Sequence, residues 1–531
     1  MFGHEWKGLQ GGRLTPPARF NFAGDVIHAR GRATPDRRAL ISVGPDGSAT
    51  TWTYRQVSEA VGRLAGAMRH LGVGAGDRVL LLMPRTGLWL VALGACHHLG
   101  AIPVPCVTQI GAGEVAYRVD RSGATAAISS GELLHLFEGL HDRIPVRIAR
   151  DPAQGWHDLD RIVDTPREAP DAPALPADAP ALMYFTSGSS GLPKAVVHGA
   201  RAVFVRSWQP WVQFGIDADD VIWTTSDPGW TRAGSCLLYG SWFWGATSLI
   251  VERSLTADDK VRLLDEHRVS VFSAVATELR QIIGRASPRP LPRLRFTISA
   301  GEAMTAELSA SWSRFSGSPL IVGYGQTETC TSTLTDPGRE AVNGMIGAAI
   351  EGNAMAVLDD EGRPCPAGVH GEIAFLGDNP GLMLGYWQDG QVVPAFARDG
   401  WHRTGDAGYQ DETGHLYFVG RADDVISSSG YRIGPTEVEN ALMLHPAVQE
   451  CAVAAAPDDL RGEVVKAFVV LRPGLSGSDE LAKELQDHVK AEIAPYKYPR
   501  RVAFVAALPR TASGKISRRA LRLGEPASET A

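Results

Sequence analysis

The stretch Tyr184-Phe-Thr-Ser-Gly-Ser-Ser-Gly-Leu-Pro-Lys194 joins an apolar run to a cluster of hydroxyl groups and glycines. This change in composition is typical of a strand that runs into a loop able to hold a phosphate. Glycine permits unusual backbone angles, so several backbone N–H groups of such a loop can point at one oxyanion. The hydroxyl groups add further donors, and the lysine adds positive charge. The candidate phosphate-binding residues are Thr186, Ser187, Gly188, Ser189, Ser190, Gly191 and Lys194.

Two alternatives compete for this stretch. In a Walker A loop the lysine directly follows a glycine and precedes a serine or threonine. Here Leu192 and Pro193 separate Gly191 from Lys194, and Ala195 follows, so an ordinary P-loop kinase is not expected. A flexible Ser/Gly linker has a similar composition, and this stretch alone does not exclude it.

The length and composition indicate a soluble protein of more than one domain. With 531 residues the chain is longer than one hydrophobic core usually supports. The 59 acidic and 52 basic residues give a formal net charge of −7, which argues against a nucleic acid or an anionic membrane as partner. The six cysteines form no Cys-x-x-Cys pair, so reduced thiols in the cytoplasm are the simplest interpretation.

Two stretches without charged side chains, residues 87–107 and 233–251, are long enough to suggest membrane spans. Histidines and prolines interrupt the first stretch, and three glycines interrupt the second. We therefore expect each stretch to form a buried helix followed by a buried strand, and we expect no membrane span. The first residues contain no apolar signal core, so export is not expected either.

The first part of the chain shows alternating helix and strand patterns, which predict a layered α/β fold. Thr53 and Gln56 match a capping box at the start of an amphipathic helix, and Gly72 follows its last turn. Residues 79–83 form a short apolar run, typical of a strand covered on both faces. The proline-rich residues 164–180 suit an exposed connection into the phosphate loop.

The pattern changes near Arg421, and the residues that follow can form a small α+β unit of their own. Thr436 and Glu439 match a second capping box, and residues 464–471 have the pattern of a strand. The fold class is therefore predicted as α/β with a large layered N-terminal domain, residues 1–422, and a small α+β lid, residues 423–523. Residues 524–531 are expected to be a disordered tail.

From about Thr51 to Leu523 the chain resembles the adenylate-forming superfamily of acyl-CoA synthetases. Two further segments carry the likeness together with the phosphate stretch, Ser427-Ser-Ser-Gly-Tyr-Arg-Ile-Gly-Pro435 and Thr511-Ala-Ser-Gly-Lys515. Segments 420–443, 461–471 and 494–500 look closest to the medium-chain acyl-CoA synthetases. The resemblance implies that a carboxylate attacks the α-phosphate of ATP, and that the thiol of coenzyme A (CoA) then attacks the acyl-adenylate. It implies ATP and CoA as co-substrates and Mg²⁺ as the cofactor.

The resemblance also assigns the nucleotide site. Thr327 contacts phosphate, and Glu328 helps to hold Mg²⁺, a hard ion that prefers oxygen ligands. Residues 299–303 match the adenine-binding turn, and Asp406 matches the carboxylate that accepts hydrogen bonds from the ribose. Taken singly, each of these segments could be an ordinary loop at the end of a strand. The implied ATP-binding residues outside the phosphate stretch are Gly301, Glu302, Ala303, Gly323, Tyr324, Gly325, Gln326, Thr327, Asp406, Arg421 and Lys515.

The resemblance makes Lys515 the principal catalytic residue, acting with Thr327, Glu328 and Lys194. A mobile lid could place the Lys515 ammonium beside the carboxylate and α-phosphate oxygens, where negative charge accumulates. Without the resemblance, a lysine near a C-terminus among other basic residues is usually solvated surface.

The resemblance also implies that the C-terminal lid takes two orientations, one for each reaction step, and that Asp423 occupies the hinge position. In the rotated state Gly430 would lie against the pantetheine arm of CoA, because a side chain there would block a narrow channel. Basic side chains suit the phosphates of CoA. The implied CoA-binding residues are Gln109, Ser429, Gly430, Tyr431, Arg461, Lys490, Tyr498, Pro499 and Arg500.

Three residues are implied near the acyl group: Trp230, Gly325 and Arg432. Gly325 stands where acetate-specific relatives carry a tryptophan that closes the pocket, so acids larger than acetate are expected: medium-chain, branched or aromatic. Trp230 could instead be a core residue. Arg432 could instead pair with Glu437 or Glu439.

An AMP-forming acyl-CoA synthetase is therefore the leading hypothesis. A second is an adenylating ligase that transfers the acyl group to a carrier protein or another nucleophile, because a phosphopantetheine arm would use the same channel. A third is a nucleotide-binding module without catalysis, which no residue favours. The expected partners are small molecules, with no nucleic acid.

Overall fold

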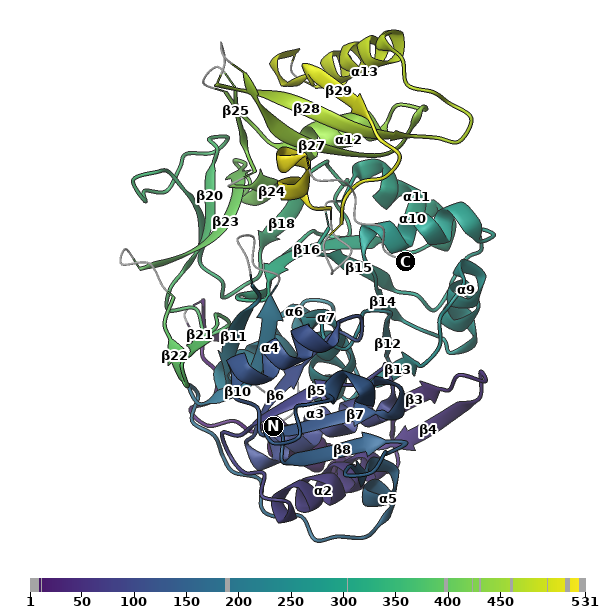
Figure 1. Ribbon diagram of the computed structural model, residues 1–531, viewed down its shortest axis with the longest axis vertical. Coiled ribbons are helices and arrows are strands. Elements are labelled where there is room, and N and C mark those ends of the chain that lie inside the picture. Colours follow the sequence, from purple (N-terminus) through teal and green to yellow (C-terminus); the bar gives the residue numbers. More distant parts are fainter. Residues whose placement is uncertain are drawn as a thin grey trace.

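The computed structural model of the chain describes residues 9–10, 12–186, 192–302, 304–395, 400–422, 424–428, 431–458, 462–493, 495–510 and 516–524. The N-terminal sheet and the C-terminal sheet lie at opposite ends of the long axis, with the largest sheet between them (Figure 1). The chain starts with a short hairpin, a π-helix and a helix: β1 (Leu9–Gln10), β2 (Arg13–Leu14), η2 (Ala23–His28) and α1 (Ala29–Ala33).

A parallel five-stranded sheet of order β6-β5-β7-β8-β9 forms the N-terminal end. Its strands are β5 (Arg78–Leu82), β6 (Ile102–Pro105), β7 (Ala126–Ser130), β8 (Val146–Arg150) and β9 (His157–Asp158), and the helices among them are α2 (Tyr54–His70), α3 (Gly87–Leu99), α4 (Ala112–Ser122), η3 (Gly131–Phe137) and α5 (Leu159–Asp164). The Thr53 side chain and Gln56 form the predicted capping box of α2. The uncharged stretch 87–107 forms the buried α3 and β6, as predicted.

The largest sheet has 13 strands in the order β19-β20-β23-β24-β18-β17-β16-β15-β14-β12-β13-β3-β4. Its parallel half consists of β3 (Arg38–Val43), β12 (Val221–Thr224), β13 (Thr247–Val251), β14 (Val271–Ser273), β15 (Phe296–Ala300) and β16 (Leu320–Gln326), with β4 (Ala49–Thr53) antiparallel at the edge. The helices of this half are α6 (Ala200–Val212), α7 (Thr231–Gly234), η4 (Ser235–Gly240), α8 (Ser241–Trp244), α9 (Ala257–Glu266), α10 (Ala276–Arg285) and α11 (Ala306–Ser316).

Both faces of these parallel strands are buried, because a parallel sheet is covered by helices on either side. Successive residues of one strand face different cores. Ile222 packs with the core formed by α2, α3, α6 and η4, whereas Trp223 packs with the core formed by α9, α10 and α11. The second uncharged stretch, 233–251, lies in α7, η4, α8 and β13, again as a buried helical segment followed by a buried strand.

The other half of the sheet is antiparallel and is built from β17 (Cys330–Leu334), β18 (Met345–Ala349), β19 (Met355–Leu358), β20 (Gly371–Leu376), β23 (Trp401–Gln410) and β24 (His415–Arg421). A separate four-stranded sheet contains β10 (Pro180–Thr186), β11 (Lys194–Gly199), β21 (Gly385–Gln388) and β22 (Gln391–Val393). Strands β10 and β11 pair antiparallel, with Thr186 opposite Lys194. The two ends of the predicted phosphate loop are therefore held side by side by a hairpin.

The C-terminal sheet forms a separate layer near the end of the chain (Figure 1). It contains β25 (Ile426–Ser428), β26 (Tyr431–Ile433), β27 (Val448–Asp458), β28 (Gly462–Leu471) and β29 (Arg501–Phe504), with α12 (Pro435–Met443), α13 (Asp479–Glu492), η5 (Pro495–Lys497) and α14 (Arg518–Leu523). This agrees with the predicted α+β character. The exact domain boundaries remain a prediction, since Asp423 lies outside the described residues, as do residues 525–531 of the expected tail.

The predicted capping box of α12 is wrong by two residues. The helix starts after Gly434, whose backbone N–H donates to Glu437 Oε1 at 3.0 Å. Pro435 occupies the first helical position, where its missing N–H costs no hydrogen bond. Glu439 instead accepts two hydrogen bonds from Arg518 Nη2, at 2.8 and 2.7 Å. That contact fixes α14 against α12, and Arg518 also lies 3.8 Å from Asp424.

Glu439→Gln should loosen α14, because one oxygen of a two-point ion pair is replaced by an amide that cannot accept from Arg518. A hydrogen bond to a charged group contributes about 1.5–3 kcal/mol, and partial exposure reduces this value. We expect the backbone amides of α14 and β27 to exchange hydrogen faster, measured by mass spectrometry. Glu361→Gln, which alters an exposed Arg363 pair, is the matched control. Equal exchange in both variants would contradict this role of Glu439.

Candidate active site

The predicted nucleotide-binding segments meet at one edge of the largest sheet. Strands β12, β14, β15 and β16 are parallel, so their carboxyl ends lie at the same edge. The segment with Trp230 follows β12, the turn with Gly301 and Glu302 follows β15, and Thr327 and Glu328 follow β16. In open α/β sheets this edge is where ligands bind.

The buried carboxylate of Asp406 is held at this edge by three side-chain donors. It pairs across β23 and β24 with Arg421, whose Nη1 donates to Oδ1 at 2.9 Å. Its Oδ2 accepts from the Tyr324 hydroxyl at 2.6 Å and from Gln326 Nε2 at 2.7 Å. Burial raises the pKa of Asp406, although these donors and the Arg421 charge act in the opposite direction. A carboxylate has about four acceptor positions, and the described residues supply three donors, which leaves one position on Oδ1 for a ligand.

The second group is the Glu328 carboxylate with its neighbours on β21 and β11. The Tyr386 hydroxyl donates to Glu328 Oε1 at 3.2 Å, and Lys194 Nζ lies 5.2 Å from the centroid of the Tyr386 ring. Burial raises the pKa of Glu328, while the Tyr386 hydrogen bond and the charges of Arg421 and Lys194 lower it. The structure thus brings together the predicted residues Lys194 and Glu328. Among the described residues, no three His, Cys, Asp or Glu side chains converge as a metal cluster.

The turn after β15 has a backbone that favours glycine. Gly301 has a φ of +82°, in the left-handed region. The next residue, Glu302, accepts a hydrogen bond from the Thr277 backbone N–H at 2.8 Å, so its carboxylate fixes the turn against the start of α10. Ala303 lies outside the described residues.

The hairpin of β16 and β17 leaves no space for a side chain at Gly325. A Cβ at this position would lie 1.8 Å from the carbonyl oxygen of Cys330, across the irregular pairing of β16 and β17. Neither tryptophan nor alanine fits here without a backbone shift. Trp230 is partly exposed, which does not favour the alternative of a core residue. Its backbone N–H donates to the carbonyl oxygen of Asp227 at 3.0 Å.

Three of the predicted CoA-binding residues gather on the C-terminal sheet domain. Lys490 Nζ lies 4.3 Å and the Arg500 guanidinium carbon 4.9 Å from the centroid of the Tyr498 ring, and Arg500 Nη1 donates to the Tyr498 hydroxyl at 3.0 Å. Lys490 also pairs with Asp487 at 2.7 Å. Pro499 is buried beside them, and Gln109 is exposed in the segment after β6.

Several predicted residues cannot be placed. Those that lie outside the described residues are Ser187, Gly188, Ser189, Ser190, Gly191, Asp423, Ser429, Gly430, Arg461 and Lys515, together with the side chains of Tyr431 and Arg432. The two acids that are the alternative partners of Arg432 have ion-pair partners among the described residues: Glu437 pairs with Lys497, and Glu439 pairs with Arg518.

Comparison with known families identifies this arrangement. The family profile described as AMP-binding enzyme matches residues 27–387, and the profile of the AMP-binding enzyme C-terminal domain matches residues 437–515. The chain belongs to the AMP-binding enzyme family.

Relatives of this AMP-binding enzyme align over nearly their whole length. Acyl-coenzyme A synthetase ACSM5 (mitochondrial) of Homo sapiens is 34% identical, with 98% of this chain and 93% of the relative covered. The solved structure of anthranilate CoA ligase AuaEII in complex with anthranoyl-AMP is 27% identical with a TM-score of 0.85, covering 96% of this chain and 98% of that one. A benzoate CoA ligase from Burkholderia xenovorans is 29% identical with a TM-score of 0.82, covering 95% of this chain and 100% of that one.

His198 is a residue of the AMP-binding enzyme that the sequence analysis missed. It is fully buried on β11, and its Nε2 lies 2.8 Å from the carbonyl oxygen of Thr327. A carbonyl only accepts, so Nε2 carries the proton. Burial and the nearby Arg206 charge hold the pKa of His198 well below its ordinary value, so the ring is neutral. A buried polar residue in the apolar run of β11 was the signal that could have predicted this bond.

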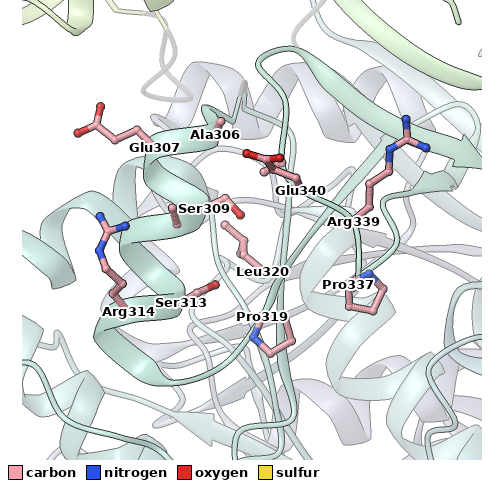
Figure 2. A pocket seen from close by; sticks show the side chains of 12 residues that line it. Ala306, Glu307, Ser309, Ser313, Arg314, Pro319, Leu320, Pro337, Arg339 and Glu340 are labelled. Carbon is pink, nitrogen blue, oxygen red and sulfur yellow. The ribbon is translucent and has the colours of Figure 1, made fainter.

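A surface hollow of about 530 Å³ lies away from these residues, between α11 and the segment after β17. Figure 2 shows Glu307 and Arg314 on one side and Arg339 and Glu340 on the other. None of the predicted site residues lines it. In the described part of the chain, no helix combines the length and apolarity that a membrane span requires.

Tyr324→Phe should weaken nucleotide binding, because it removes one of three donors that orient the Asp406 carboxylate. Since a hydrogen bond to a charged group contributes about 1.5–3 kcal/mol, partial loss predicts an AMP affinity lower by about five- to tenfold. Calorimetric titration with AMP measures this. Tyr417→Phe, which removes a hydroxyl bound to the surface residue Asp411 at 3.2 Å, is the control and should leave affinity unchanged. Equal affinities in the two variants would argue against Asp406 as a ligand.

His198→Leu should displace the segment carrying Thr327 and Glu328, because the buried carbonyl of Thr327 loses its donor. An unsatisfied buried group costs about 1–3 kcal/mol, so the affinity for ATP should fall by roughly tenfold or more. His198→Gln, whose amide can still donate toward Thr327, should retain more affinity. If both variants bind ATP as the unchanged protein does, His198 has no part in positioning this segment.

Proposed function

We propose that this protein is an AMP-forming acyl-CoA synthetase, a ligase that joins a carboxylic acid to CoA with ATP as the energy source. The observation that carries the proposal is the meeting of Asp406, Arg421, Thr327, Glu328 and Lys194 at the carboxyl edge of the sheet. The near full-length likeness to acyl-coenzyme A synthetases supports it, because both the large domain and the C-terminal domain are matched.

The nucleotide would lie along this edge. Adenine would pack on the turn at Gly301 and Glu302, where the left-handed backbone permits close approach. The open acceptor position on Asp406 Oδ1 would take a ribose hydroxyl, since three protein donors already bind this carboxylate. Thr186, Lys194 and Thr327 would contact phosphates, together with loop 187–191.

The reaction would proceed in two balanced steps. In the first, a carboxylate oxygen of the acid attacks the α-phosphorus of ATP. The bond between the α-phosphorus and the oxygen that bridges to the β-phosphate breaks, and diphosphate leaves with the bonding electron pair. In the second, the sulfur of CoA attacks the carbonyl carbon of the acyl-adenylate, AMP leaves with the bonding electron pair, and the thiol proton passes to solvent. Positioning and charge stabilisation govern phosphoryl transfer, and the Lys515 ammonium would supply positive charge in the first step.

Mg²⁺ would be held by Glu328. This carboxylate fits a hard ion, and because the described residues offer no cluster of further protein ligands, phosphate oxygens and water would complete the coordination. Bound there, Mg²⁺ would neutralise phosphate charge.

CoA would be bound by the C-terminal domain after rotation about Asp423. Lys490 and Arg500, which flank Tyr498, present two cations beside an aromatic ring and suit a phosphorylated nucleotide. These cations favour free CoA over a carrier protein as the acceptor. We place the enzyme in the cytoplasm, since all six cysteines are free thiols.

The experiment that tests the function is mass spectrometry of AMP and acyl-CoA formed from Mg-ATP, CoA and a panel of acids. The panel runs from acetate to dodecanoate and includes branched and aromatic acids. We expect thioester and AMP in equal amounts, with acids larger than acetate preferred. AMP or acyl-adenylate without thioester would contradict CoA as acceptor, and nucleotide binding without AMP would contradict catalysis.

Two variants separate the half-reactions in the same assay. Lys515→Ala should reduce adenylation at least a hundredfold, in the range found when a charge-stabilising donor is removed, while thioester formation from supplied acyl-adenylate persists. Gly430→Leu should do the reverse, because its side chain would obstruct the pantetheine channel. Equal losses in both steps for both variants would contradict a lid with two orientations.

A further inference from the structure

Arg232 is a charged residue in a segment where an apolar acyl pocket is expected. It lies on the short helix α7, two residues after Trp230, at the carboxyl end of β12. Its Nη2 donates to the carbonyl oxygen of Ala300, the last residue of β15. The same nitrogen lies 3.3 Å from the position that a Cβ on Gly301 would occupy. The guanidinium therefore lies against the proposed adenine turn, on the segment that also carries Trp230, the residue predicted to contact the acyl group.

This guanidinium has no carboxylate partner among the described residues. No acidic side chain of that part of the chain comes within ion-pair distance of Arg232, although Glu302 and Glu278 are near enough to influence its pKa. Both acids are already engaged. Glu278 binds Lys260 at 2.7 Å and the Thr225 hydroxyl at 2.5 Å, and Glu302 accepts the Thr277 N–H.

The environment makes an unpaired cation unfavourable. Arg232 is partly buried, and burial lowers the pKa of its guanidinium, while Cys236, Glu302 and Glu278 act in the opposite direction. A guanidinium carries five N–H donors, and the described contacts use Nη2 alone. Buried charges are normally paired, so the remaining donors are suited to an anionic group supplied from outside the chain.

Two other arginines, Arg421 and Arg295, have a carboxylate partner, whereas Arg206, like Arg232, has none among the described residues. Arg421 pairs with Asp406, and Arg206, which is fully buried, donates to the Ser235 hydroxyl at 3.1 Å and lies against His198. Arg295 pairs with Asp220 at 2.6 Å. Arg232 thus combines partial burial, proximity to the proposed acyl segment and unused donors.

We propose that Arg232 determines specificity for the acid and that the preferred substrate carries a second anionic oxygen group, such as a second carboxylate, on its acyl chain. This inference rests on the proposed synthetase function and specifies its substrate class. The reacting carboxylate faces the α-phosphate, and the second oxyanion pairs with the guanidinium. An unbranched alkyl acid leaves the guanidinium desolvated and unpaired, so it binds less well.

The test compares monocarboxylic and dicarboxylic acids of equal carbon number: butyrate with succinate, pentanoate with glutarate, and hexanoate with adipate. Formation of acyl-CoA by the purified full-length enzyme gives kcat/KM for each acid. We expect at least one dicarboxylate to exceed its monocarboxylate partner by tenfold or more. This comparison needs no variant, so it holds even where a substitution impairs folding.

Arg232→Leu should lower the ratio of kcat/KM for the dicarboxylate to kcat/KM for the monocarboxylate by about a hundredfold. A site built to bind a polar group discriminates strongly against a substrate that lacks this group, and the leucine removes that discrimination. The change should fall on KM for the dicarboxylate, with KM for ATP changed little. Arg232→Lys should retain part of the preference. Arg314→Leu, at an exposed arginine of α11, is the matched control.

Three results would overturn the proposal. Monocarboxylates used as well as or better than their dicarboxylate partners would leave the synthetase function intact and refute the role of Arg232. An Arg232→Leu variant that loses activity equally on both members of a pair, with a raised KM for ATP, would assign Arg232 to fixing the adenine turn through Ala300. If no acid yields AMP, the synthetase function itself fails, and this inference fails with it.

Discussion

The buried carboxylate of Asp406 connects the consecutive strands β23 and β24 to β16, which lies far from them in sequence. Tyr324 and Gln326 reach it from β16, Arg421 reaches it from β24, and Asp406 itself lies on β23. Burying a carboxylate is costly unless it is hydrogen-bonded and paired, and here both conditions are met. The contact therefore ties the antiparallel half of the largest sheet to the parallel half, at the edge where the site lies. It also fixes Arg421, the last residue of β24.

The sequence correctly predicted a helix start where the capping residues lie within one turn of each other. The capping box of α2 was predicted from Thr53 and Gln56 because both partners lie within one turn. The start of α12 was placed two residues late for the opposite reason. Glu439 has the right spacing for a cap, yet its partner is Arg518, 79 residues further along the chain. No short-range pattern reveals such a pair, although Pro435 at the first helical position could have corrected the boundary.

The candidate site was predicted mainly from motifs, and the structure groups those motif residues that it describes. Residues outside the motifs were not predicted. His198 supports Thr327 and Tyr386 binds Glu328, but each contact joins segments that only the folded sheet brings together. Gly325 shows a related limit: the sequence suggested an enlarged pocket, whereas the structure adds a backbone reason for glycine in the nearby carbonyl of Cys330. Motifs therefore predicted the residues that are proposed to contact the ligand. They did not predict the residues, such as His198 and Tyr386, that fix those contact residues in position.

The ion pairs around Arg518 have a mechanical consequence. Arg518 binds Glu439 of α12 and approaches Asp424, and Arg522 of the same helix also pairs with Asp424. Helix α14 directly follows the segment that ends at Lys515, and Asp424 directly follows the predicted hinge. A rotation about residue 423 would then move both ends of the C-terminal domain together as one rigid body, because the ion pairs hold them to each other. A change of backbone torsion at the predicted hinge would move Lys515 toward or away from the sheet edge while the ion pairs of Arg518 and Arg522 stay intact.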